Sequence, residues 1–327
     1  MKAFFRQLNM TDIINNLYHR AKKNKKRILL PETSDPRIQE AIKLLHQGGE
    51  VIPIALNTDD GLPEGTEVFL DHPDKDLWLG RIYEHVQSKR GLERSKVEQS
   101  LSNPLLLSCY LLATGYVDGG VAGSIATTAN VLKAGFKSLG VKDGTKTISS
   151  MFLMALPDGR VLSYGDCAVV PNPTAAQLAD IAIFTSETHQ RLTGETPNVA
   201  MLSFSTKGSA NHADVDKVTE AMALVTQKAP QLNIDGELQY DAAINPVIGT
   251  KKAPDSPVAG KANVFIFPDL DAGNIGYKIT QELGGARAIG PILGGFPKPW
   301  MDLSRGCGVQ DIIDVAVVSA LLGDASP

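Results

Sequence analysis

A serine, an arginine and an aspartate lie close together just before the last apolar segment of the chain. Residues 302–311 read Asp-Leu-Ser-Arg-Gly-Cys-Gly-Val-Gln-Asp and run into a segment whose apolar residues recur at helical spacing. The first amides of a helix are unpaired and its dipole is positive there, so an anion or a developing oxyanion would be favoured beside Ser304 and Arg305. The alternative is that Arg305 is a solvated surface charge and Asp311 is an acid of the first helical turn, where acids are common.

A second candidate is a glycine-rich loop. Residues 119–130 read Gly-Gly-Val-Ala-Gly-Ser-Ile-Ala-Thr-Thr-Ala-Asn, and an amphipathic helix carrying Lys133 follows. Such a loop can wrap phosphate oxygens with backbone N–H groups and threonine hydroxyls, with Lys133 as a point charge. A glycine turn followed by a threonine N-cap would give the same sequence.

The elements that must position these loops alternate between strand and helix. After a helix at about 11–23, a strand is predicted at 27–30, and Asp35 and Pro36 then mark a helix start. Further strands are predicted at 51–56, 117–121, 147–153, 161–164, 199–204, 264–267 and 288–293. Helices between most of them predict an α/β fold with a largely parallel sheet system covered on both faces.

Two features interrupt this alternation. The turn sequence at 156–160, Leu-Pro-Asp-Gly-Arg, predicts a hairpin and suggests that a second sheet begins near it. The stretches 206–214 and 246–260 are predicted to be long polar connections, and long loops in compact domains are functional or mobile.

Composition excludes several classes of protein. The chain has 327 residues, enough for about two domains, and 43% of them are apolar and 21% charged, as in ordinary globular proteins. The net charge of −4 gives no global attraction for nucleic acid or an anionic membrane, and the longest apolar runs are too short to span a bilayer. Without a signal segment, a cytoplasmic location is expected. The three cysteines, Cys109, Cys167 and Cys307, are widely spaced, which suits reduced, buried thiols.

The common catalytic motifs are absent. No GxxxxGK[ST], HExxH, GxSxG or zinc-type Cys/His spacing occurs, so these nucleotide-binding, hydrolase and metal classes lack their residues. The run at 306–308 begins like a dinucleotide fingerprint, but Asp311 occupies the place of the third glycine.

Five short runs in a fixed order resemble the phosphate acetyltransferase family, and the likeness covers about residues 103–323, with a weaker one at 29–35. The runs are Tyr-Gly-Asp-Cys-Ala (164–168), Gln-Tyr-Asp-Ala-Ala (239–243), Ser-Pro-Val-Ala-Gly (256–260), Phe-Ile-Phe-Pro-Asp-Leu (265–270) and Asp-Leu-Ser-Arg-Gly (302–306). The resemblance implies reversible transfer of an acetyl group between coenzyme A and phosphate, through direct thiol attack and with no metal or permanently bound cofactor. Coenzyme A, acetyl phosphate and inorganic phosphate would be its partners.

The resemblance also assigns roles. It implies that Ser304 and Arg305 stabilise the tetrahedral intermediate and that Asp311 receives the thiol proton. The substrate-binding residues that it implies are Gly123, Ser124, Thr127, Thr128, Lys133, Asn274, Tyr277 and Lys278.

The implied fold is two three-layer α/β/α domains with a cleft between them, like that of isocitrate and isopropylmalate dehydrogenases. The expected division is 1–146 with 294–327, including a C-terminal helix that returns to the first domain, and 147–293. A homodimer is expected.

The sequence departs from the family pattern at two positions. Lys133 stands where the family usually has an arginine, which removes a planar bidentate fork but keeps the charge. Gln87 stands where another arginine is expected, with Arg90 and Arg94 nearby. These two departures leave open which acyl group the protein prefers.

Three other functions remain. One is the same reaction on a butyryl or propionyl group. Another is a binding module that senses acetyl-coenzyme A, as the similar C-terminal domain of malic enzymes does, although Ser304, Arg305 and Asp311 are all retained here. A third, a dehydrogenase of the isocitrate type, rests on a broad likeness of fold alone, and fold does not imply function.

Overall fold

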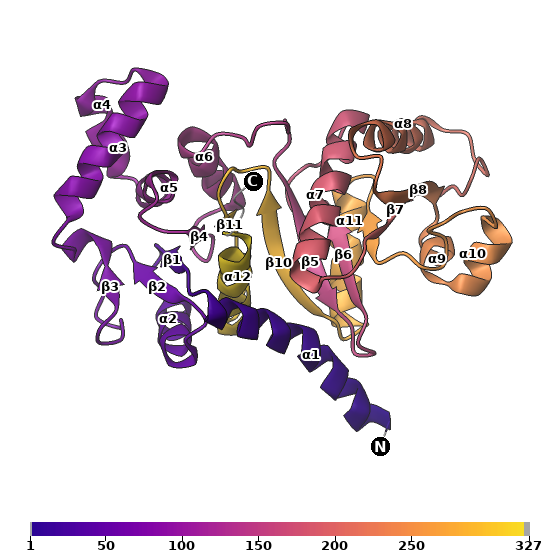
Figure 1. Cartoon of the computed structure of the whole chain (residues 1–327), viewed down its shortest axis with the longest axis horizontal. Coiled ribbons are helices and arrows are strands. Elements are labelled where there is room, and N and C mark those ends of the chain that lie inside the picture. The colour runs from indigo at the N-terminus through magenta and orange to yellow at the C-terminus, as the bar shows by residue number, and fades with distance from the viewer. Residues whose placement is uncertain (1, 324–327) are drawn as a thin grey trace. The chain divides into compact units, whose positions relative to one another are not determined.

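The computed structural model describes residues 2–323, which form two compact units (Figure 1). One, which we call the split unit, comprises residues 15–143 and 296–323. The other, the inserted unit, comprises residues 144–295 with residues 2–14. Whether these units correspond to independently folding domains with the expected boundaries stays a prediction.

The split unit is built on a five-stranded sheet in which every paired strand is parallel. Its strand order is β11 (Trp300–Met301), β4 (Gly119–Val121), β1 (Arg27–Leu30), β2 (Ile52–Ala55) and β3 (Glu67–Val68). Because β11 and β4 pair in parallel, with Trp300 opposite Gly120, the segments that follow both strands leave the sheet at the same edge. That edge carries both candidate loops.

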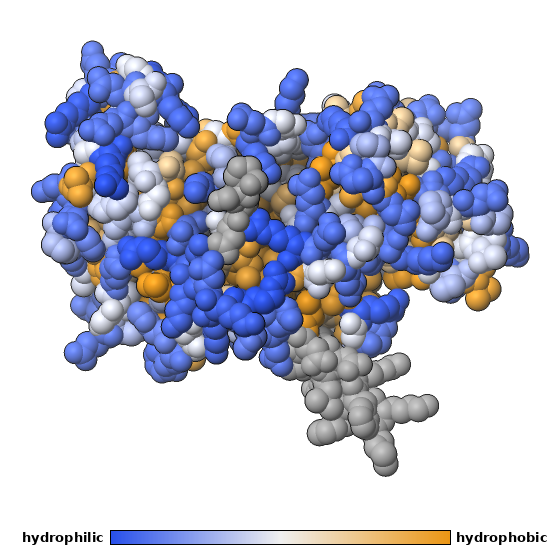
Figure 2. Space-filling view, viewed as in Figure 1, coloured by the Kyte–Doolittle hydropathy of each residue, from blue (hydrophilic) through white to orange (hydrophobic). Residues whose placement is uncertain are grey.

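The helices of the split unit pack on this sheet and on one another. They are α2 (Pro36–Gly48), α3 (Lys75–Arg90), α4 (Arg94–Leu101), α5 (Pro104–Thr114), α6 (Thr128–Ser138) and α12 (Val309–Leu322), with a short 3-10 helix, η1 (Phe69–Asp71). Helix α12, buried along most of its length, packs against β4 and α2. The visible surface over α3 and α4 is mainly hydrophilic (Figure 2).

The inserted unit has a six-stranded mixed sheet. Its order is β10 (Arg287–Gly294), β5 (Ser149–Ala155), β6 (Val161–Gly165), β9 (Val264–Ile266), β7 (Asn198–Leu202) and β8 (Asn233–Leu238). Strand β5 is antiparallel to both neighbours, and its hairpin with β6 confirms the turn predicted at 156–160. The other pairs are parallel.

Helices cover both faces of this mixed sheet. Helices α7 (Ala175–Thr193) and α8 (Ala213–Lys228) lie side by side and contribute to one apolar core (Figure 1). Helix α9 (Tyr240–Ile244) and part of α11 (Leu270–Glu282) pack on a second core built from the other face. The predicted α/β fold with flanking helices is confirmed.

Three details of the predicted elements are wrong. Helix α1 (Lys2–Lys23) begins well before residue 11. The stretch 246–260 is not a continuous loop, because α10 (Pro246–Lys252) begins at its Pro246, where Asn245 caps the helix. Strands β3, β8 and β11 were missed, since two have only two residues and the third, Asn-Ile-Asp-Gly-Glu-Leu, carries polar residues.

Within residues 2–323, no helix is long and apolar enough to cross a membrane. In the same range no group of three or more His, Cys, Asp or Glu side chains could hold a metal ion.

Candidate active site

The two candidate loops of the split unit follow neighbouring strands. The glycine-rich loop joins β4 to α6, and the segment that we call the Ser-Arg loop, residues 302–308, joins β11 to α12. Ligand sites of open parallel sheets form at the carboxyl ends of the strands, so the fold places both loops where such a site is expected.

A carboxylate already occupies the glycine-rich loop. Glu32, which lies just after β1, accepts hydrogen bonds from the amides of Gly123 (2.7 Å), Ser124 (2.8 Å), Ile125 (3.3 Å) and Ala126 (2.7 Å). The Ser124 hydroxyl donates to the same carboxylate at 3.0 Å. The loop is thus an anion cradle, as its sequence indicated, but its anion is a side chain of the same protein.

The remaining polar groups of this loop are also engaged. The Thr127 hydroxyl accepts a hydrogen bond from the amide of Asn130 and so caps α6. This is the threonine N-cap that the sequence offered as the alternative to phosphate binding. The Thr128 hydroxyl donates to Asp302 at 2.6 Å, which ties the glycine-rich loop to the Ser-Arg loop.

Gly123 is required where these two loops meet. It has a φ of +112°, and a Cβ built on it would lie 2.4 Å from Oδ1 of Asp302 and 2.7 Å from the amide nitrogen of Leu303. Any larger residue would force the loops apart.

Asp302 is a buried acid at the base of the Ser-Arg loop. Burial raises the pKa of Asp302 to about 6, and the nearby Glu32 carboxylate adds to this, whereas the hydrogen bond from Thr128 opposes it. Its Oδ1 atom is buried without a hydrogen-bond partner among the residues described. Asp302 is therefore expected to hold a proton at mildly acidic pH.

Arg37, in the first turn of α2, clamps the two loops together. Its guanidinium donates to the backbone carbonyl oxygens of Arg305 (2.9 Å), Cys307 (2.8 Å) and Ser124 (3.0 Å). Asp35 accepts from the same guanidinium at 2.6 Å, and this contact lowers the pKa of the Asp35 carboxyl. One planar side chain thus binds three carbonyls and a carboxylate, which a lysine could not reproduce.

The side chains of Ser304 and Arg305 are exposed, in contrast to the groups of the glycine-rich loop. The Ser304 hydroxyl accepts the amide of Gly306 at a long 3.3 Å, and its carbonyl accepts the amide of Cys307 at 2.9 Å, so the backbone forms a tight turn. No contact of the Arg305 guanidinium is found among residues 2–323. Both groups are available to a ligand.

Asp311 lies in the first turn of α12. Its Oδ2 atom accepts the amide of Gly308 at 2.8 Å, and the carboxylate also gains from the positive end of the helix dipole. Asp311 therefore has the structural role that the sequence left open, that of an acid in the first turn of a helix. It also remains partly exposed beside the Ser-Arg loop.

The cysteines are poor nucleophiles. Burial raises the pKa of the Cys307 thiol to about 11, and it raises the pKa of Cys109 and of Cys167 well above the ordinary value. All three are free and buried, as predicted. A thiolate is the reactive form, so a covalent acyl-cysteine route is disfavoured at each of them.

Lys133 lines a cavity of about 210 Å³ on α6. The cavity is shared with Lys137, Asn130 and Asn103, and apolar side chains of α5 and α6 complete it. Two lysines and two amides suit an anionic group, which fits the binding role expected of Lys133.

The other three predicted binding residues lie on α11, in the inserted unit. The Asn274 amide donates to the carbonyl of Cys167 at 3.0 Å, and the Tyr277 ring stacks on Phe152 with centroids 4.1 Å apart. Lys278 lies over the Tyr277 ring at 5.8 Å. Asn274 and Tyr277 thus have structural contacts, and the substrate-binding roles of all three stay predictions.

Three residues that organise the site were missed by sequence reasoning, namely Glu32, Arg37 and Asp302. Glu32 carried a usable signal, because a carboxylate directly after a buried parallel strand lies at the edge where ligand loops gather. Arg37 carried none, since an arginine in a first helical turn is usually solvated.

The fold and the site together define an α/β protein that presents an exposed Ser-Arg pair and an aspartate where a loop enters a helix. Residues 12–320 match the family model described as phosphate acetyl/butaryl transferase. A phosphate acetyltransferase from Thermoanaerobacterium thermosaccharolyticum is 41% identical over 324 residues, which cover 94% of this chain and 98% of that protein. One from Clostridium acetobutylicum is 40% identical over 326 residues, 95% of this chain and 98% of that protein.

A solved structure of a phosphotransacetylase from Streptococcus pyogenes is also similar to this chain. It superposes with a TM-score of 0.87 at 35% identity and covers 97% of this chain and 99% of that one. The chain belongs to the phosphate acetyl/butaryl transferase family, and the resemblance found in its sequence is confirmed.

Proposed function

We propose that this protein is a phosphate acetyltransferase that reversibly converts acetyl-coenzyme A and phosphate into acetyl phosphate and coenzyme A. The observation that carries the proposal is the Ser-Arg loop, because it presents Ser304 and Arg305 to solvent and places Asp311 in the helix turn that follows. Relatives of similar length named phosphate acetyltransferase, about 40% identical to this chain, support the same function.

In the proposed reaction the coenzyme A thiol attacks the carbonyl carbon of acetyl phosphate. Asp311 accepts the thiol proton, the carbonyl becomes an oxyanion, and the intermediate collapses as the C–O bond to phosphate breaks. Ser304, Arg305 and nearby amides stabilise the oxyanion. Arg37 supports this step indirectly, because it fixes the carbonyl of Arg305 and thereby the backbone from which that side chain extends.

Proton transfer to Asp311 accompanies the attack. A thiol with an ordinary pKa near 8.5 and a carboxyl near 3.9 differ enough that complete prior transfer would cost roughly 6 kcal/mol. A concerted transfer avoids that cost, since the thiol becomes far more acidic as its bond to carbon forms.

The test of the function is thioester formation from acetyl phosphate and coenzyme A by the purified protein, followed by ultraviolet absorbance. We expect turnover with acetyl phosphate and slower turnover with butyryl phosphate. Faster turnover with butyryl phosphate would support the longer-chain alternative, for which the lysine at position 133 is the motivating departure. Tight acetyl-coenzyme A binding without turnover would instead support the sensing module.

We further propose that the enzyme acts in the cytoplasm as a homodimer, without a metal or a permanently bound cofactor. Exposed apolar residues support the dimer, because Ile275 and Ile279 of α11 and Leu283, which follows the helix, are exposed at four-residue intervals and form one apolar stripe. Light scattering should give twice the chain mass for the wild type and a monomer for Ile279→Glu. A variant that remains dimeric would exclude α11 as the interface. Unchanged activity after dialysis against a chelator would support a metal-free reaction.

A further inference from the structure

Ile125 is an exposed apolar residue in the middle of the glycine-rich loop. It is 53% exposed, although the neighbouring Ser124 is buried. Among the described residues of the split unit, it is the only large exposed apolar residue in a loop that directly follows β1, β4 or β11. These three strands are neighbours in one parallel sheet (Figure 1), so Ile125 lies at the edge that also carries the Ser-Arg loop.

The backbone of Ile125 is held by a carboxylate. Its amide donates to Glu32 at 3.3 Å, and the amides of Ser124 and Ala126 on either side donate to the same carboxylate at 2.8 Å and 2.7 Å. A β-branched side chain also has few rotamers. The loop therefore presents the apolar surface of Ile125 in a fixed place, and a ligand that packs on it would lose little entropy in ordering it.

Arg37 ties the backbone before Ile125 to the exposed part of the Ser-Arg loop. Its guanidinium donates to the carbonyl oxygen of Ser124 at 3.0 Å and to that of Arg305 at 2.9 Å. Because Ile125 directly follows Ser124, the Ile125 and Arg305 side chains extend from backbone segments that one planar group holds together. This edge of the sheet thus offers an apolar side chain, a hydroxyl and a guanidinium that are all exposed.

The fold of the loop does not account for an isoleucine at position 125. Single apolar side chains are common on protein surfaces and by themselves need no explanation. This loop, however, is held through the amides of residues 123–126 and through the Thr127 cap, and half of the Ile125 surface stays in water. A smaller or polar residue would serve the loop equally well.

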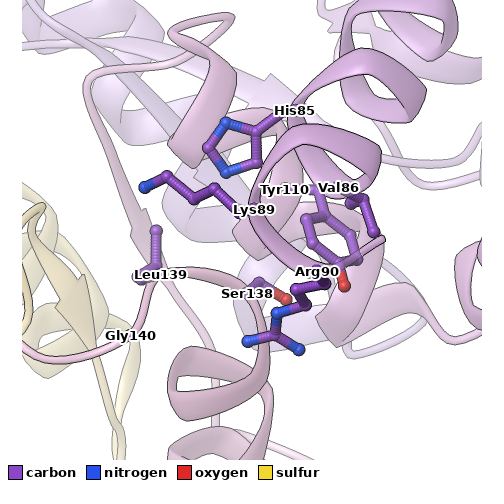
Figure 3. Close-up of a pocket in the computed structure, with 8 residues that line it drawn as sticks. All are labelled: His85, Val86, Lys89, Arg90, Tyr110, Ser138, Leu139 and Gly140. Carbon is purple, nitrogen blue, oxygen red and sulfur yellow. The ribbon is translucent and has the colours of Figure 1, made fainter. Parts of the chain in front are cut away.

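The cavities of the split unit described above and in Figure 3 are less suited to a small alkyl group. The cavity of about 230 Å³ between α3, α5 and α6 is lined by His85, Lys89 and Arg90, and the apolar residues that complete it are buried (Figure 3). The Lys133 cavity carries two lysines and two amides. In either cavity an alkyl group would lie among cations or polar groups, whereas Ile125 offers it an apolar surface.

We propose that Ile125 contacts the alkyl part of the acyl group in the acyl phosphate substrate and thereby contributes to the choice between acetyl and longer chains. An acyl phosphate is apolar at one end and anionic at the other, which matches an isoleucine tied through the backbone to an exposed arginine. The proposal rests on the proposed function, because it names a specificity-determining residue for that reaction. It leaves the amides of the glycine-rich loop bound to Glu32.

Truncation of Ile125 tests the contact. Ile125→Ala removes most of the side chain, so kcat/KM for acetyl phosphate should fall by roughly 3- to 10-fold, while a butyryl chain fills the vacated space. The ratio of kcat/KM for butyryl phosphate to that for acetyl phosphate should therefore rise by roughly tenfold. Because this ratio compares two substrates of one protein sample, a partly unfolded sample does not alter it.

Ile125→Val and Ile125→Thr separate apolar contact from shape. Both substitutions keep the β-branch and are similar in size, but threonine carries a hydroxyl where valine carries a methyl group. Ile125→Val should stay within about twofold of the wild-type kcat/KM for acetyl phosphate, and Ile125→Thr should be lower than Ile125→Val by roughly 3- to 10-fold. Equal values in the two variants would overturn the apolar contact.

Ile52→Ala is the matched control. Ile52 is an exposed isoleucine at the first residue of β2, so it lies at the opposite edge of the same parallel sheet. The ratio of the two kcat/KM values in Ile52→Ala should equal that of the wild type. An unchanged ratio in Ile125→Ala, or the same change in Ile52→Ala, would overturn the proposal.

A non-reactive analogue distinguishes failure of this inference from failure of the proposed reaction. In acetonylphosphonate a methylene group replaces the bridging oxygen of acetyl phosphate, so calorimetry measures its binding without turnover. Ile125→Ala should raise its Kd by roughly 3- to 10-fold, and Ile52→Ala should leave the Kd unchanged. If the wild type turns over no acyl phosphate, the proposed function is wrong and this Kd decides the inference. Weaker binding by Ile125→Ala would support the contact, and an unchanged Kd or no binding to the wild type would overturn it.

Discussion

The glycine-rich loop and the Ser-Arg loop leave neighbouring parallel strands at one edge of the same sheet, yet they use their polar groups in opposite ways. Glu32 takes the amides of residues 123–126, and the hydroxyls of Thr127 and Thr128 are also hydrogen-bonded within the protein. Ser304 and Arg305, in contrast, are exposed. A loop rich in donors is a binding site only if those donors are left unsatisfied.

We infer from this difference that the glycine-rich loop supports the Ser-Arg loop, which carries the proposed chemistry. The glycine-rich loop is held by Glu32, which lies just after β1, and Arg37 from α2 binds it to the Ser-Arg loop through three carbonyl oxygens. A phosphate that uses the amides of the glycine-rich loop would have to displace a carboxylate that makes five hydrogen bonds. We therefore infer that the backbone of the glycine-rich loop positions the Ser-Arg loop, while the substrate-binding roles expected of Gly123, Ser124, Thr127 and Thr128 stay predictions.

Of the variants that test this comparison, Asp311→Asn is expected to lose the most activity. The amide can still accept the Gly308 hydrogen bond that the carboxylate accepts now, so the start of α12 should be preserved. It cannot take the thiol proton, so turnover should fall by about 10²- to 10⁴-fold with a modest change in coenzyme A affinity. Initial rates of thioester formation measure the effect.

Asp76→Asn is the matched control for this variant, because Asp76 is an exposed acid in the first turn of α3. It should retain full turnover. Near-normal turnover in Asp311→Asn would instead restrict Asp311 to its capping role and remove the base from the proposed mechanism.

Arg305→Ala should have the next largest effect. The backbone carbonyl of Arg305, which Arg37 binds, is unchanged by this substitution, so the loop should keep its conformation. The charge opposite the developing oxyanion is lost, and turnover should fall by about 10²- to 10³-fold with little change in KM. Arg160→Ala, which removes an exposed arginine from the turn between β5 and β6, is the control and should leave turnover unchanged. A rise confined to the KM for phosphate would make Arg305 a binding residue.

Glu32→Gln tests the scaffold. A glutamine has one acceptor oxygen and turns an NH₂ group toward amides that also donate, so we expect the free energy of unfolding to fall by about 2–4 kcal/mol. Turnover should fall less than in the two variants above, because Glu32 does not take part in the chemistry. Denaturant unfolding followed by circular dichroism measures the stability.

Glu40→Gln provides the control. Within residues 2–323 the carboxylate of Glu40 contacts only the exposed Lys43 on α2, so the substitution should cost less than about 0.5 kcal/mol. If Glu32→Gln were as stable as wild type and more active, the carboxylate would compete with the substrate in the glycine-rich loop. That result would break the contrast between the two loops.

Much of this arrangement was accessible from the sequence because it rests on local signals. The Asp35-Pro36 helix start, the Thr127 cap and the hairpin at 156–160 are each set by a few adjacent residues, and the structure confirms all three. The family motifs are equally local, since each is a short run with a fixed order.

The parts that were missed depend on partners far apart in the chain. Glu32 meets Gly123 across 91 positions, and Arg37 meets Cys307 across 270. Neither pairing follows from spacing, because it depends on the order of β1, β4 and β11 in the sheet. The sequence could indicate that the glycine-rich loop binds an anion, but only the topology shows that the anion is Glu32.

The smallest effect is expected from Asp302→Asn. This variant tests the contact between Thr128 and Asp302, which links the two loops, through the pH dependence of the free energy of unfolding. Burial raises the pKa of Asp302 in the folded protein to about 6, above its ordinary value near 3.9. The folded state therefore binds this proton more tightly than the unfolded state does. The contribution of this proton to stability is complete below pH 4 and is lost as the pH rises through 6, a change of at most about 3 kcal/mol.

Asparagine has no such proton, so the variant should lack this loss of stability between pH 4 and pH 6. His189 in the inserted unit acts in the opposite sense, because burial lowers its pKa to about 4 and the protein loses stability as the pH falls below about 6.5. That contribution is common to both proteins and cancels when the variant is subtracted from the wild type at each pH. A difference that stayed constant across this range would mean that Asp302 is ionised beside Glu32. The hydrogen bond from Thr128 that links the two loops would then be made to a charged carboxylate rather than to a neutral acid.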